Sequence, residues 1–295
     1  MSKIGIVIVN YNGAKYQNDC IKSLYEMDYQ DFEIIVVDSA SSDNSVALLK
    51  AEYPKVHVIE CKENVGVAAG NNIGIKYAKE IGTEYTLLMN NDVELDSKLL
   101  GLLIERADEE TVVVPKIYFY QPNDLLWYAG GELVWNKGTA IHTGMREYDN
   151  EVLNSEKYVD YAPTCCMLVH NSVFDRVGYM DEKLFMYFDD TDFCVRLGQH
   201  NIKILYLPQA FMWHKVSSST GGENSKVSMY YISRNQLYYK KKYADKISFK
   251  TTLYIHAKAI AKFILSPLRK QHKNDKWIIV AYKDFYQGKM GRKDF

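Results

Sequence analysis

Short runs of apolar and β-branched residues alternate with longer segments of helical periodicity through the first part of the chain. Runs of the first kind predict strands, and segments with apolar residues three or four positions apart predict helices. Regular alternation of the two is typical of a parallel sheet covered by helices, so we expect an α/β fold. The predicted strands lie at 4–9, 33–37, 56–60 and 85–89, and the predicted helices near 15–25, 45–52, 68–79 and 97–108.

The pattern becomes less regular after a further apolar run at 111–120. Residues 121–150 form an excursion that we interpret as a loop. Its aromatic residues, Trp127 and Trp135 among them, suit either a core or a platform for a sugar ring. The later elements are a strand at 204–207, a loop at 213–223 and helices rich in Tyr and Lys from 228 onward.

The overall charge conceals an acidic body and a basic tail. The formal net charge is −1, but residues 234–295 hold sixteen Lys and Arg against four Asp and Glu, so residues 1–233 are strongly acidic. With 295 residues and 47% hydrophobic content the chain can bury one large core. We therefore expect one large domain at 1–233, followed by a basic helical extension at 234–295.

Cysteine usage and hydropathy bear on where the chain works. The five cysteines are odd in number, include an adjacent pair and show no CxxC spacing, which favours a reducing cytoplasm. The first apolar run is too short for a secretory signal and is interpreted as a strand. The most apolar later stretch, at 253–268, is interrupted by His256, Lys258 and Lys262 and is a poor membrane span. We expect a soluble or peripheral protein.

Polar residues directly follow three of the predicted strands. Open parallel sheets bind ligands at the carboxyl ends of their strands, and here these ends precede Asn10 and Tyr11, Asp38, and Asn91 with Asp92. A carboxylate such as Asp38 can accept a hydrogen bond from the N3–H of uracil or thymine, whereas neutral cytosine presents an acceptor there. The alternative is that Asp38 caps the helix that follows.

The segment Asn90-Asn91-Asp92 suits either a cation or a turn. Mg²⁺ prefers oxygen ligands and commonly uses one or two protein carboxylates, so Asp92 is the candidate ligand. Asn and Asp are also favoured in plain turns. His214 is a candidate second metal ligand as a neutral imidazole, and the alternative is a structural or exposed histidine.

A glycine-rich segment at 64–72 leads into a predicted helix. Glycines let the backbone approach a ligand closely, but the spacing is not the GxGxxG of dinucleotide binders. A phosphate cradle and a simple helix cap both fit this segment.

Three carboxylates follow an aromatic run at 185–188. Asp189, Asp190 and Asp192 are close together, and crowded like charges raise the pKa of a carboxyl group, which suits a general base. Asp190 is the preferred base, with Asp189 as the second acid of the pair. An acidic helix start is the alternative. Asp192 fits that alternative because Arg196 lies four residues on, so we assign it a structural role.

Taken together and in order, these segments resemble glycosyltransferase family 2, the inverting enzymes with the GT-A fold, and within it the rhamnosyltransferase-like branch. The resemblance covers residues 4 to about 240. The set of segments in this order is more specific than any single segment. It implies a mostly parallel, Rossmann-like sheet flanked by helices, with a nucleotide-sugar-binding half at about 1–115 and an acceptor-binding half at about 116–233. The matching segments are 7–12, 36–45, 64–72, 87–92, 164–170, 177–196 and His214.

The resemblance assigns roles residue by residue. Asp92 matches the last residue of the family's DxD metal motif, His214 its later metal-binding histidine and Asp190 its catalytic base. Arg234 belongs to an Arg-Asn pair that would either approach the diphosphate or brace the site. The implied cofactor is Mn²⁺ or Mg²⁺. The nucleotide-sugar-binding residues are then Asn10, Tyr11, Asp38, Asn72, Asn91, Asp92 and Arg234, the metal ligands Asp92 and His214, and the catalytic pair Asp190 and Asp189.

Two departures from the family pattern matter. Asn90 replaces the first aspartate of DxD, so metal binding depends more heavily on Asp92. Asp189 stands where many members have glutamate, which leaves open which acid is the base. The QxxRW motif and membrane spans of the family's processive synthases are not visible in the sequence, so we expect one sugar per encounter.

The resemblance implies transfer of a sugar from a UDP- or TDP-sugar, TDP-rhamnose among them, to a saccharide or polyprenyl-linked saccharide in cell-surface polysaccharide synthesis. Two other functions remain open. A non-catalytic nucleotide-sugar or membrane-surface binding protein would agree with Asn90. A sugar nucleotidyltransferase would need a glycine-rich N-terminal loop with a basic residue, which residues 10–13 do not supply.

The basic extension predicts contact with an anionic membrane, at the cytoplasmic inner face of the cell membrane. A solvated helical face packed on the body is the alternative. We expect no nucleic acid as a partner, because no nucleic-acid module motif is present. The basic residues lie at helical intervals among apolar ones and comprise Lys240, Lys241, Lys242, Lys258, Lys262, Arg269, Lys270, Lys273 and Lys276.

Overall fold

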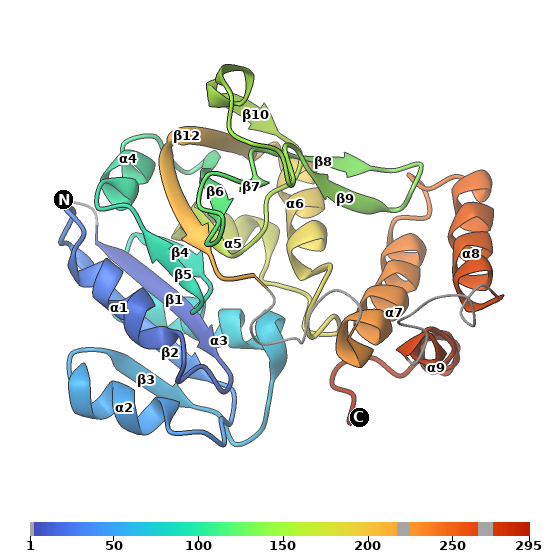
Figure 1. Ribbon diagram of the computed structural model, residues 1–295, viewed down its shortest axis with the longest axis horizontal. Coiled ribbons are helices and arrows are strands. Elements are labelled where there is room, and N and C mark those ends of the chain that lie inside the picture. The colour runs from blue at the N-terminus through green and yellow to red at the C-terminus, as the bar shows by residue number, and fades with distance from the viewer. Residues whose placement is uncertain (1–2, 217–224, 265–273) are drawn as a thin grey trace.

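The computed structural model describes residues 3–216, 225–264 and 274–295. A ten-stranded sheet forms the body, in the order β10-β12-β6-β11-β4-β1-β2-β3, with β5 beside β12 and β7 beside β6 (Figure 1). Its strands are β1 (Ile4–Asn10), β2 (Phe32–Asp38), β3 (His57–Glu60), β4 (Tyr85–Met89), β5 (Val93–Leu95), β6 (Thr111–Phe119), β7 (Leu126–Tyr128), β10 (Lys157–Val159), β11 (Cys166–His170) and β12 (Lys203–His214).

Helices and one separate hairpin surround this sheet (Figure 1). The hairpin consists of β8 (Gly131–Val134) and β9 (Thr139–His142). The helices are α1 (Gln17–Tyr25), α2 (Ser45–Glu52), α3 (Gly66–Glu80), α4 (Leu99–Ile104), α5 (Asn171–Val177), α6 (Asp189–Gln199), α7 (Lys226–Lys242), α8 (Phe249–Ile264) and α9 (Lys276–Tyr286), with a 3₁₀ turn at Glu151–Asn154.

The first half of the sheet forms as its sequence predicts. β1 pairs in parallel with β2 and β4, and β2 pairs in parallel with β3. Because such crossovers are right-handed, α1 and α2 cover one face, and α3, which leads back across β1 to β4, covers the other. The strand order therefore reverses between β1 and β4, and open sheets bind ligands at the carboxyl ends beside such a point.

Helix α3 approaches β1 closely because glycines face the strand. A Cβ at Gly74 would lie 2.2 Å from a methyl group of Val7, and one at Gly70 would lie 2.8 Å from the methyl groups of Val9. Gly70 belongs to the segment that suited either a phosphate cradle or a cap. Its contact shows that it serves the packing of helix on strand.

Residues 121–150 are more regular than the loop we expected. β7 pairs antiparallel with β6, and β8 with β9. The sequence did not predict these strands because each is only three or four residues long, with turns between them. Two of the aromatic residues have the core role that the sequence left open. Tyr128 is buried in the core and Trp135 stacks on Tyr239 of α7, whereas Trp127 lines a cavity.

Strand β12 is longer than expected and includes His214. We expected a strand at 204–207 and placed His214 in a following loop, but β12 continues to His214, which pairs with Val93 of β5 and Phe119 of β6. A register shift around Pro208 accommodates the missing amide hydrogen at that residue. Pairing on both sides fixes the position of the His214 backbone. Of the loop expected at 213–223, residues from 217 onward lie outside the described residues.

The basic extension packs against the body. Its expected start at residue 234 falls inside α7, whose side chains Asn235 and Gln236 donate hydrogen bonds to carbonyl groups of the body. α9 packs against α7, and α8 against α9 (Figure 1). None of the helices in the described parts of the chain is long and apolar enough to cross a bilayer. Three of the cations expected to face a membrane, Arg269, Lys270 and Lys273, lie outside the described residues.

Candidate active site

A cavity of about 640 Å³ lies at the carboxyl ends of β1 and β4, where the strand order reverses. It brings together side chains that are distant in the sequence and were expected to share one site. The predicted residues that line it are Tyr11, Asn91, Asp92, Asp189, Asp190 and His214. The remaining predicted residues, Asn10, Asp38, Asn72 and Arg234, lie behind its wall.

Asn10 and Asp38 are buried directly behind the wall. Asp38 Oδ1 accepts a hydrogen bond from Asn10 Nδ2 at 2.8 Å and Oδ2 accepts one from the Ser41 N–H at 2.9 Å. Because Ser41, and not α2, uses this carboxylate, the capping alternative for Asp38 is wrong. Asn10 Oδ1 in turn accepts a hydrogen bond from Asn91 Nδ2 at 2.8 Å. The network ties the ends of β1, β2 and β4 together and supports Tyr11, which reaches the cavity.

Asn72 and Arg234 are also buried and are committed to backbone groups. Asn72 Nδ2 donates to the Met180 carbonyl and its Oδ1 accepts from the Met180 N–H, both at 2.9 Å. The Arg234 guanidinium donates to the carbonyl oxygens of Gly291 at 2.6 Å and Leu184 at 3.2 Å. Neither side chain lines the cavity, and neither do Asn10 and Asp38, so direct contact of these four residues with a ligand stays a prediction. For Arg234, these contacts support the bracing role that the sequence left open.

Asp92 and His214 face each other in the cavity wall. His214 Nε2 lies 3.1 Å from Asp92 Oδ1 and 3.3 Å from Asn90 Nδ2. Buried His214 Nδ1 has no hydrogen-bond partner among the described residues. Two neighbouring ligands of an octahedral ion with bonds of about 2.1 Å lie about 3 Å apart, so this carboxylate and imidazole are spaced to hold one divalent cation.

The protein supplies few ligands for such a cation. Within the described ranges, no group of three His, Cys, Asp or Glu side chains gathers in a way that could hold a metal ion. Mg²⁺ usually keeps several waters and takes one or two carboxylates together with phosphate oxygens of a substrate. The pair of Asp92 and His214 therefore suits a cation that is completed by a bound diphosphate.

Asp189 and Asp190 form a buried pair at the start of α6. Burial raises the pKa of both carboxyl groups, and the charge of Asp190 raises the pKa of Asp189 further. Three hydrogen bonds oppose this for Asp190: from Tyr161 Oη to Oδ2 at 2.7 Å, and from the Thr191 N–H and hydroxyl to Oδ1 at 2.6 and 3.1 Å. Asp190 is thus the more readily ionised member of the pair, as a general base requires.

His142 and Trp127 complete the wall beside the acid pair. Burial lowers the pKa of His142 to about 4, so its imidazole is neutral at pH 7. Its Nδ1 lies 2.9 Å from the Trp127 carbonyl, which can only accept, so Nδ1 carries the proton and Nε2 faces the Tyr161 hydroxyl at 3.5 Å. The Trp127 ring contacts His142 at 4.4 Å and His214 at 4.7 Å between ring centroids. The Trp127 ring therefore contacts both a candidate metal ligand and the histidine beside Tyr161.

The loop that precedes the acid pair has an unfavourable backbone conformation. Phe185, Tyr187 and Phe188 all have positive φ, between 62° and 67°. Each such residue costs on the order of 1 kcal/mol or more, so the loop needs anchors from elsewhere. Asn235 Nδ2 of α7 lies 2.8–2.9 Å from three carbonyl oxygens of this loop. The basic extension therefore holds part of the candidate active site in place.

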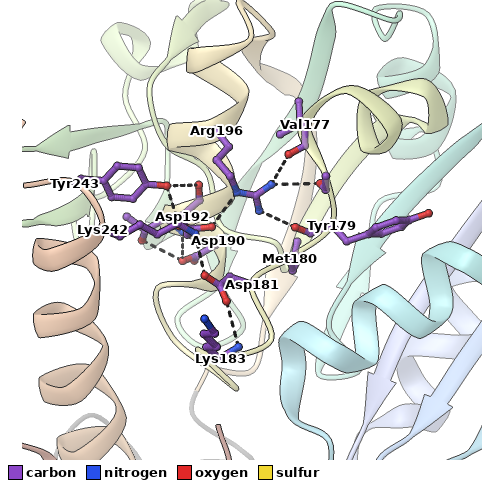
Figure 2. Close-up of polar contacts among 12 residues, drawn as sticks. Val177, Tyr179, Met180, Asp181, Lys183, Asp190, Asp192, Arg196, Lys242 and Tyr243 are labelled. Carbon is purple, nitrogen blue, oxygen red and sulfur yellow. Dashed lines mark hydrogen bonds and ion pairs between the residues drawn. The ribbon is translucent and has the colours of Figure 1, made fainter. Parts of the chain in front are cut away.

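Asp192 has the structural role predicted for it (Figure 2). Its Oδ2 accepts a hydrogen bond from Arg196 Nε at 2.9 Å, while Oδ1 pairs with Lys242 at 2.6 Å and accepts from the Tyr243 hydroxyl at 2.8 Å. Arg196 also donates to carbonyl oxygens in the segment 177–179. The first turn of α6, which carries the acid pair, is thereby fixed to α7 and to the preceding loop.

Some residues of the cavity carried no sequence signal. Tyr161 belongs to no motif, and its hydrogen bond to Asp190 arises only from tertiary packing. Arg292 lies in the extension, which the sequence characterised only by its charge, yet it lines the same cavity. Trp127 was noted only as an aromatic member of the excursion at 121–150, and His142 lies in the same excursion.

Residues 5–178 match the family model described as Glycosyl transferase family 2. This chain belongs to glycosyltransferase family 2. The matched residues run from β1 to the end of α5, and thus include Asp38 and Asp92 but not the acid pair or His214.

Curated relatives agree with this membership and with its rhamnosyltransferase-like branch. The low-salt glycan biosynthesis hexosyltransferase Agl10 of Haloferax volcanii is 30% identical over 69% of this chain and 64% of its own length. The dTDP-rhamnosyl transferase RfbF of Shigella flexneri is 28% identical over 74% and 71%. The N-acetylglucosaminyl-diphospho-decaprenol L-rhamnosyltransferase of Mycobacterium tuberculosis is 24% identical over 73% and 77%. The chain thus spans less than two thirds of Agl10.

Solved structures show that the fold is GT-A. The mannosyltransferase PcManGT from Pyrobaculum calidifontis, in complex with GDP-Man and Mn²⁺, aligns with a TM-score of 0.59 at 15% identity over 98% of this chain and 88% of its own. GalNAc-T7, solved with UDP, GalNAc and Mn²⁺, aligns with a TM-score of 0.66 at 14% identity over 97% and 58%. At these identities the likeness concerns the fold alone.

Proposed function

We propose that this protein is an inverting glycosyltransferase that moves a sugar from a UDP- or TDP-sugar to a saccharide or polyprenyl-linked saccharide in cell-surface polysaccharide synthesis. The observation that carries the proposal is the convergence of Asp92, His214 and Asp190 on one cavity. The names of two relatives support it, because one is a dTDP-rhamnosyl transferase and the other acts on a decaprenol-linked sugar.

The nucleoside of the donor would lie on the side of β1 and β2. Tyr11 lines the cavity there with 44% of its surface exposed, and its ring suits stacking on a pyrimidine. Asp38, directly before the lining residue Ser39, would accept the N3–H of uracil or thymine. A cytosine would instead bring an acceptor towards this carboxylate, so we expect a UDP- or TDP-sugar.

Asp92 and His214 would hold Mn²⁺ or Mg²⁺. The spacing of 3.1 Å between His214 Nε2 and Asp92 Oδ1 fits such a ligand pair. When bound, the cation would neutralise negative charge on the departing diphosphate. The Mn²⁺ in both structural neighbours is in keeping with this. Asn90 supplies an amide where a second carboxylate would add negative charge, so Asp92 carries most of the electrostatic attraction.

Asp190 would act as the general base. Its carboxylate takes the proton of the acceptor hydroxyl while that oxygen forms its bond to the anomeric carbon and the bond to the diphosphate breaks. Attack opposite the leaving group inverts the anomeric configuration. Tyr161 orients the Asp190 carboxylate, and Asp189, whose pKa is raised by burial and by Asp190, retains a proton more readily.

A screen of nucleotide sugars with Mn²⁺ or Mg²⁺ tests this function. A ligand that binds only the folded protein raises its melting temperature, so we expect a metal-dependent shift with UDP- or TDP-sugars and release of nucleoside diphosphate once an acceptor is added. Preference for a purine nucleotide sugar, or no shift with any sugar, would contradict the proposal. Binding without release across acceptors would favour a non-catalytic nucleotide-sugar binding protein.

We also propose that α8 contacts an anionic membrane surface, where polyprenyl-linked acceptors lie. Exposed apolar side chains recur along one side of this helix, among basic residues. A basic helix with an exposed apolar stripe is typical of helices that lie in the interface of a bilayer. The apolar residues are Phe249, Leu253, Ile260 and Ile264, and the basic residues are Lys250, Lys258 and Lys262.

Vesicle flotation tests this contact. We expect the protein to float with vesicles that contain phosphatidylglycerol, and the double substitution Leu253→Glu, Ile260→Glu to abolish flotation. Ile141→Glu, at an exposed apolar residue of β9, serves as the matched control and should still float. Equal flotation of the α8 variant and the wild type would contradict the proposal.

A further inference from the structure

The cavity has little positive charge for an anionic donor. In the described part of the chain its lining contains more carboxylates than basic side chains. A nucleoside diphosphate in the same cavity adds two or three negative charges, which these carboxylates repel. Even with one divalent cation, donor binding therefore calls for a basic side chain. The carboxylates are those of Asp92, Asp190 and Asp294, with Asp189 as a further acid that retains a proton more readily, and the basic side chains are those of Arg292 and Lys293.

Lys293 is committed to a structural pair. Its Nζ lies 2.8 Å from Asp284 Oδ2, and this pairing helps to keep the pKa of Asp284 below its usual value. The same ammonium group lies 5.7 Å from the centroid of the Tyr230 ring. Lys293 therefore has partners within the extension that a ligand would have to displace.

Arg292 has weaker partners. Its Nη1 lies 3.8 Å from Glu63 and its Nε lies 3.3 Å from Asp294, and the side chains of these acids are 75% and 90% exposed. Exposed pairs of this kind contribute little to stability and exchange easily. The planar guanidinium also matches phosphate geometry with two parallel hydrogen bonds. Of the two basic side chains in the lining, Arg292 is thus the one available to a phosphate.

The backbone on both sides of Arg292 is held firmly. The Gly291 carbonyl accepts a hydrogen bond from Arg234 at 2.6 Å, and its N–H donates to the Lys183 carbonyl at 2.9 Å. On the other side the Lys293 N–H donates to the Tyr231 hydroxyl at 2.8 Å. These anchors leave the Arg292 side chain free to move while its Cα stays in the cavity wall.

We propose that Arg292 binds the diphosphate of the nucleotide-sugar donor, and that Arg234 is a positioning residue that holds the segment 291–293 against the cavity. The inference rests on the proposed function and deepens it, because it makes the extension part of the donor site. It also accounts for the burial of Arg234, which acts on the diphosphate through another arginine.

Calorimetric titration with UDP and uridine, or with dTDP and thymidine, at fixed Mg²⁺ tests the role of Arg292. A hydrogen-bonded charge pair is worth about tenfold or more in affinity, so we expect Arg292→Gln to weaken nucleoside diphosphate binding by at least that factor and to leave nucleoside binding unchanged. Arg292→Lys should lose less. Lys289→Gln removes an exposed charge from the same segment outside the lining, and should bind as the wild type does.

Three results would overturn the assignment: unchanged diphosphate affinity in Arg292→Gln, an equal loss of nucleoside affinity, or a loss seen only with the intact nucleotide sugar. Each leaves the proposed glycosyltransferase function standing, since the wild type still binds. A wild type that binds neither UDP nor dTDP contradicts the proposed function itself, and is thus a different outcome.

A double-mutant cycle tests the positioning role of Arg234. If Arg234 acts through Arg292, Arg234→Gln weakens diphosphate binding but adds no further loss to Arg292→Gln. Additive losses would show that the two arginines act separately and would overturn this role. Melting temperatures of all four proteins separate a binding effect from unfolding, and the Arg292 variants alone still test the diphosphate contact if Arg234→Gln fails to fold.

Discussion

Replacing Tyr161 by phenylalanine removes one hydrogen bond from the proposed base and leaves its other partners in place. Tyr161 Oη donates to Asp190 Oδ2 at 2.7 Å, while Thr191 serves Oδ1. Burial already raises the pKa of Asp190, and the Tyr161 hydrogen bond opposes this rise. In Tyr161→Phe the ionised carboxylate loses that stabilisation, so its pKa rises further.

The size of the effect follows from the hydrogen bond. A hydrogen bond to a charged group contributes about 1.5–3 kcal/mol. The substitution also removes a weaker hydrogen bond from the protonated carboxyl group, so only part of this energy shifts the pKa. A difference of about 1.4 kcal/mol corresponds to one pKa unit. A base must be ionised to act, so activity falls as pH falls through its pKa. We therefore expect the acidic limb of the kcat/KM profile to move to higher pH by about one unit in Tyr161→Phe.

The assay is a pH profile of nucleoside diphosphate release at saturating metal, with the donor and acceptor identified by the screen. Tyr158→Phe, at an exposed tyrosine on β10, is the matched control and should leave the limb unchanged. An acidic limb that stays in place, or moves to lower pH, in Tyr161→Phe would show that Asp190 is not the titrating base.

Three further substitutions test packing, the acidic helix start and the metal. Gly74→Ala forces a methyl group into β1 and should cost about 1–3 kcal/mol of unfolding free energy, whereas Gly101→Ala, with open space around it, should be neutral or slightly stabilising in urea unfolding. Asp192→Asn removes the buried partner of Arg196 and Lys242 and should cost about 3 kcal/mol of unfolding free energy. Asp175→Asn, at a carboxylate that is 64% exposed, should cost less than about 1 kcal/mol. Asp92→Asn should abolish the Mn²⁺-dependent part of UDP or dTDP affinity in titrations with and without chelator; a retained metal effect would exclude Asp92 as a ligand.

The parallel half of the fold was predictable because its signals are local. Strand Tyr85–Met89 and helix Ser45–Glu52 have the bounds expected from hydrophobic periodicity. Tyr11 after β1 and Asn91 and Asp92 after β4 line the cavity because parallel strands share one carboxyl edge. This explains why Asp92 and Tyr11 could be placed at the site from sequence alone.

The second half was harder because its order comes from long-range pairing. Strand β12 continues past Pro208 only because β5 and β6 pair with it, so no local pattern places His214 at its end. Tyr161 meets Asp190 only through tertiary packing. Arg234 belongs to the Arg-Asn pair of the family pattern, but its partners, Gly291 among them, become its neighbours only when the extension packs in the folded protein.

Asp190→Asn tests the central claim most directly, because the account gives donor binding and base catalysis to different residues of one cavity. The substitution keeps the size of the side chain and removes its basicity. We expect wild-type affinity for UDP or dTDP with Mn²⁺, together with a transfer rate that falls by about 10²–10⁴-fold. Transfer at the wild-type rate in Asp190→Asn, with the donor still bound, would contradict the account.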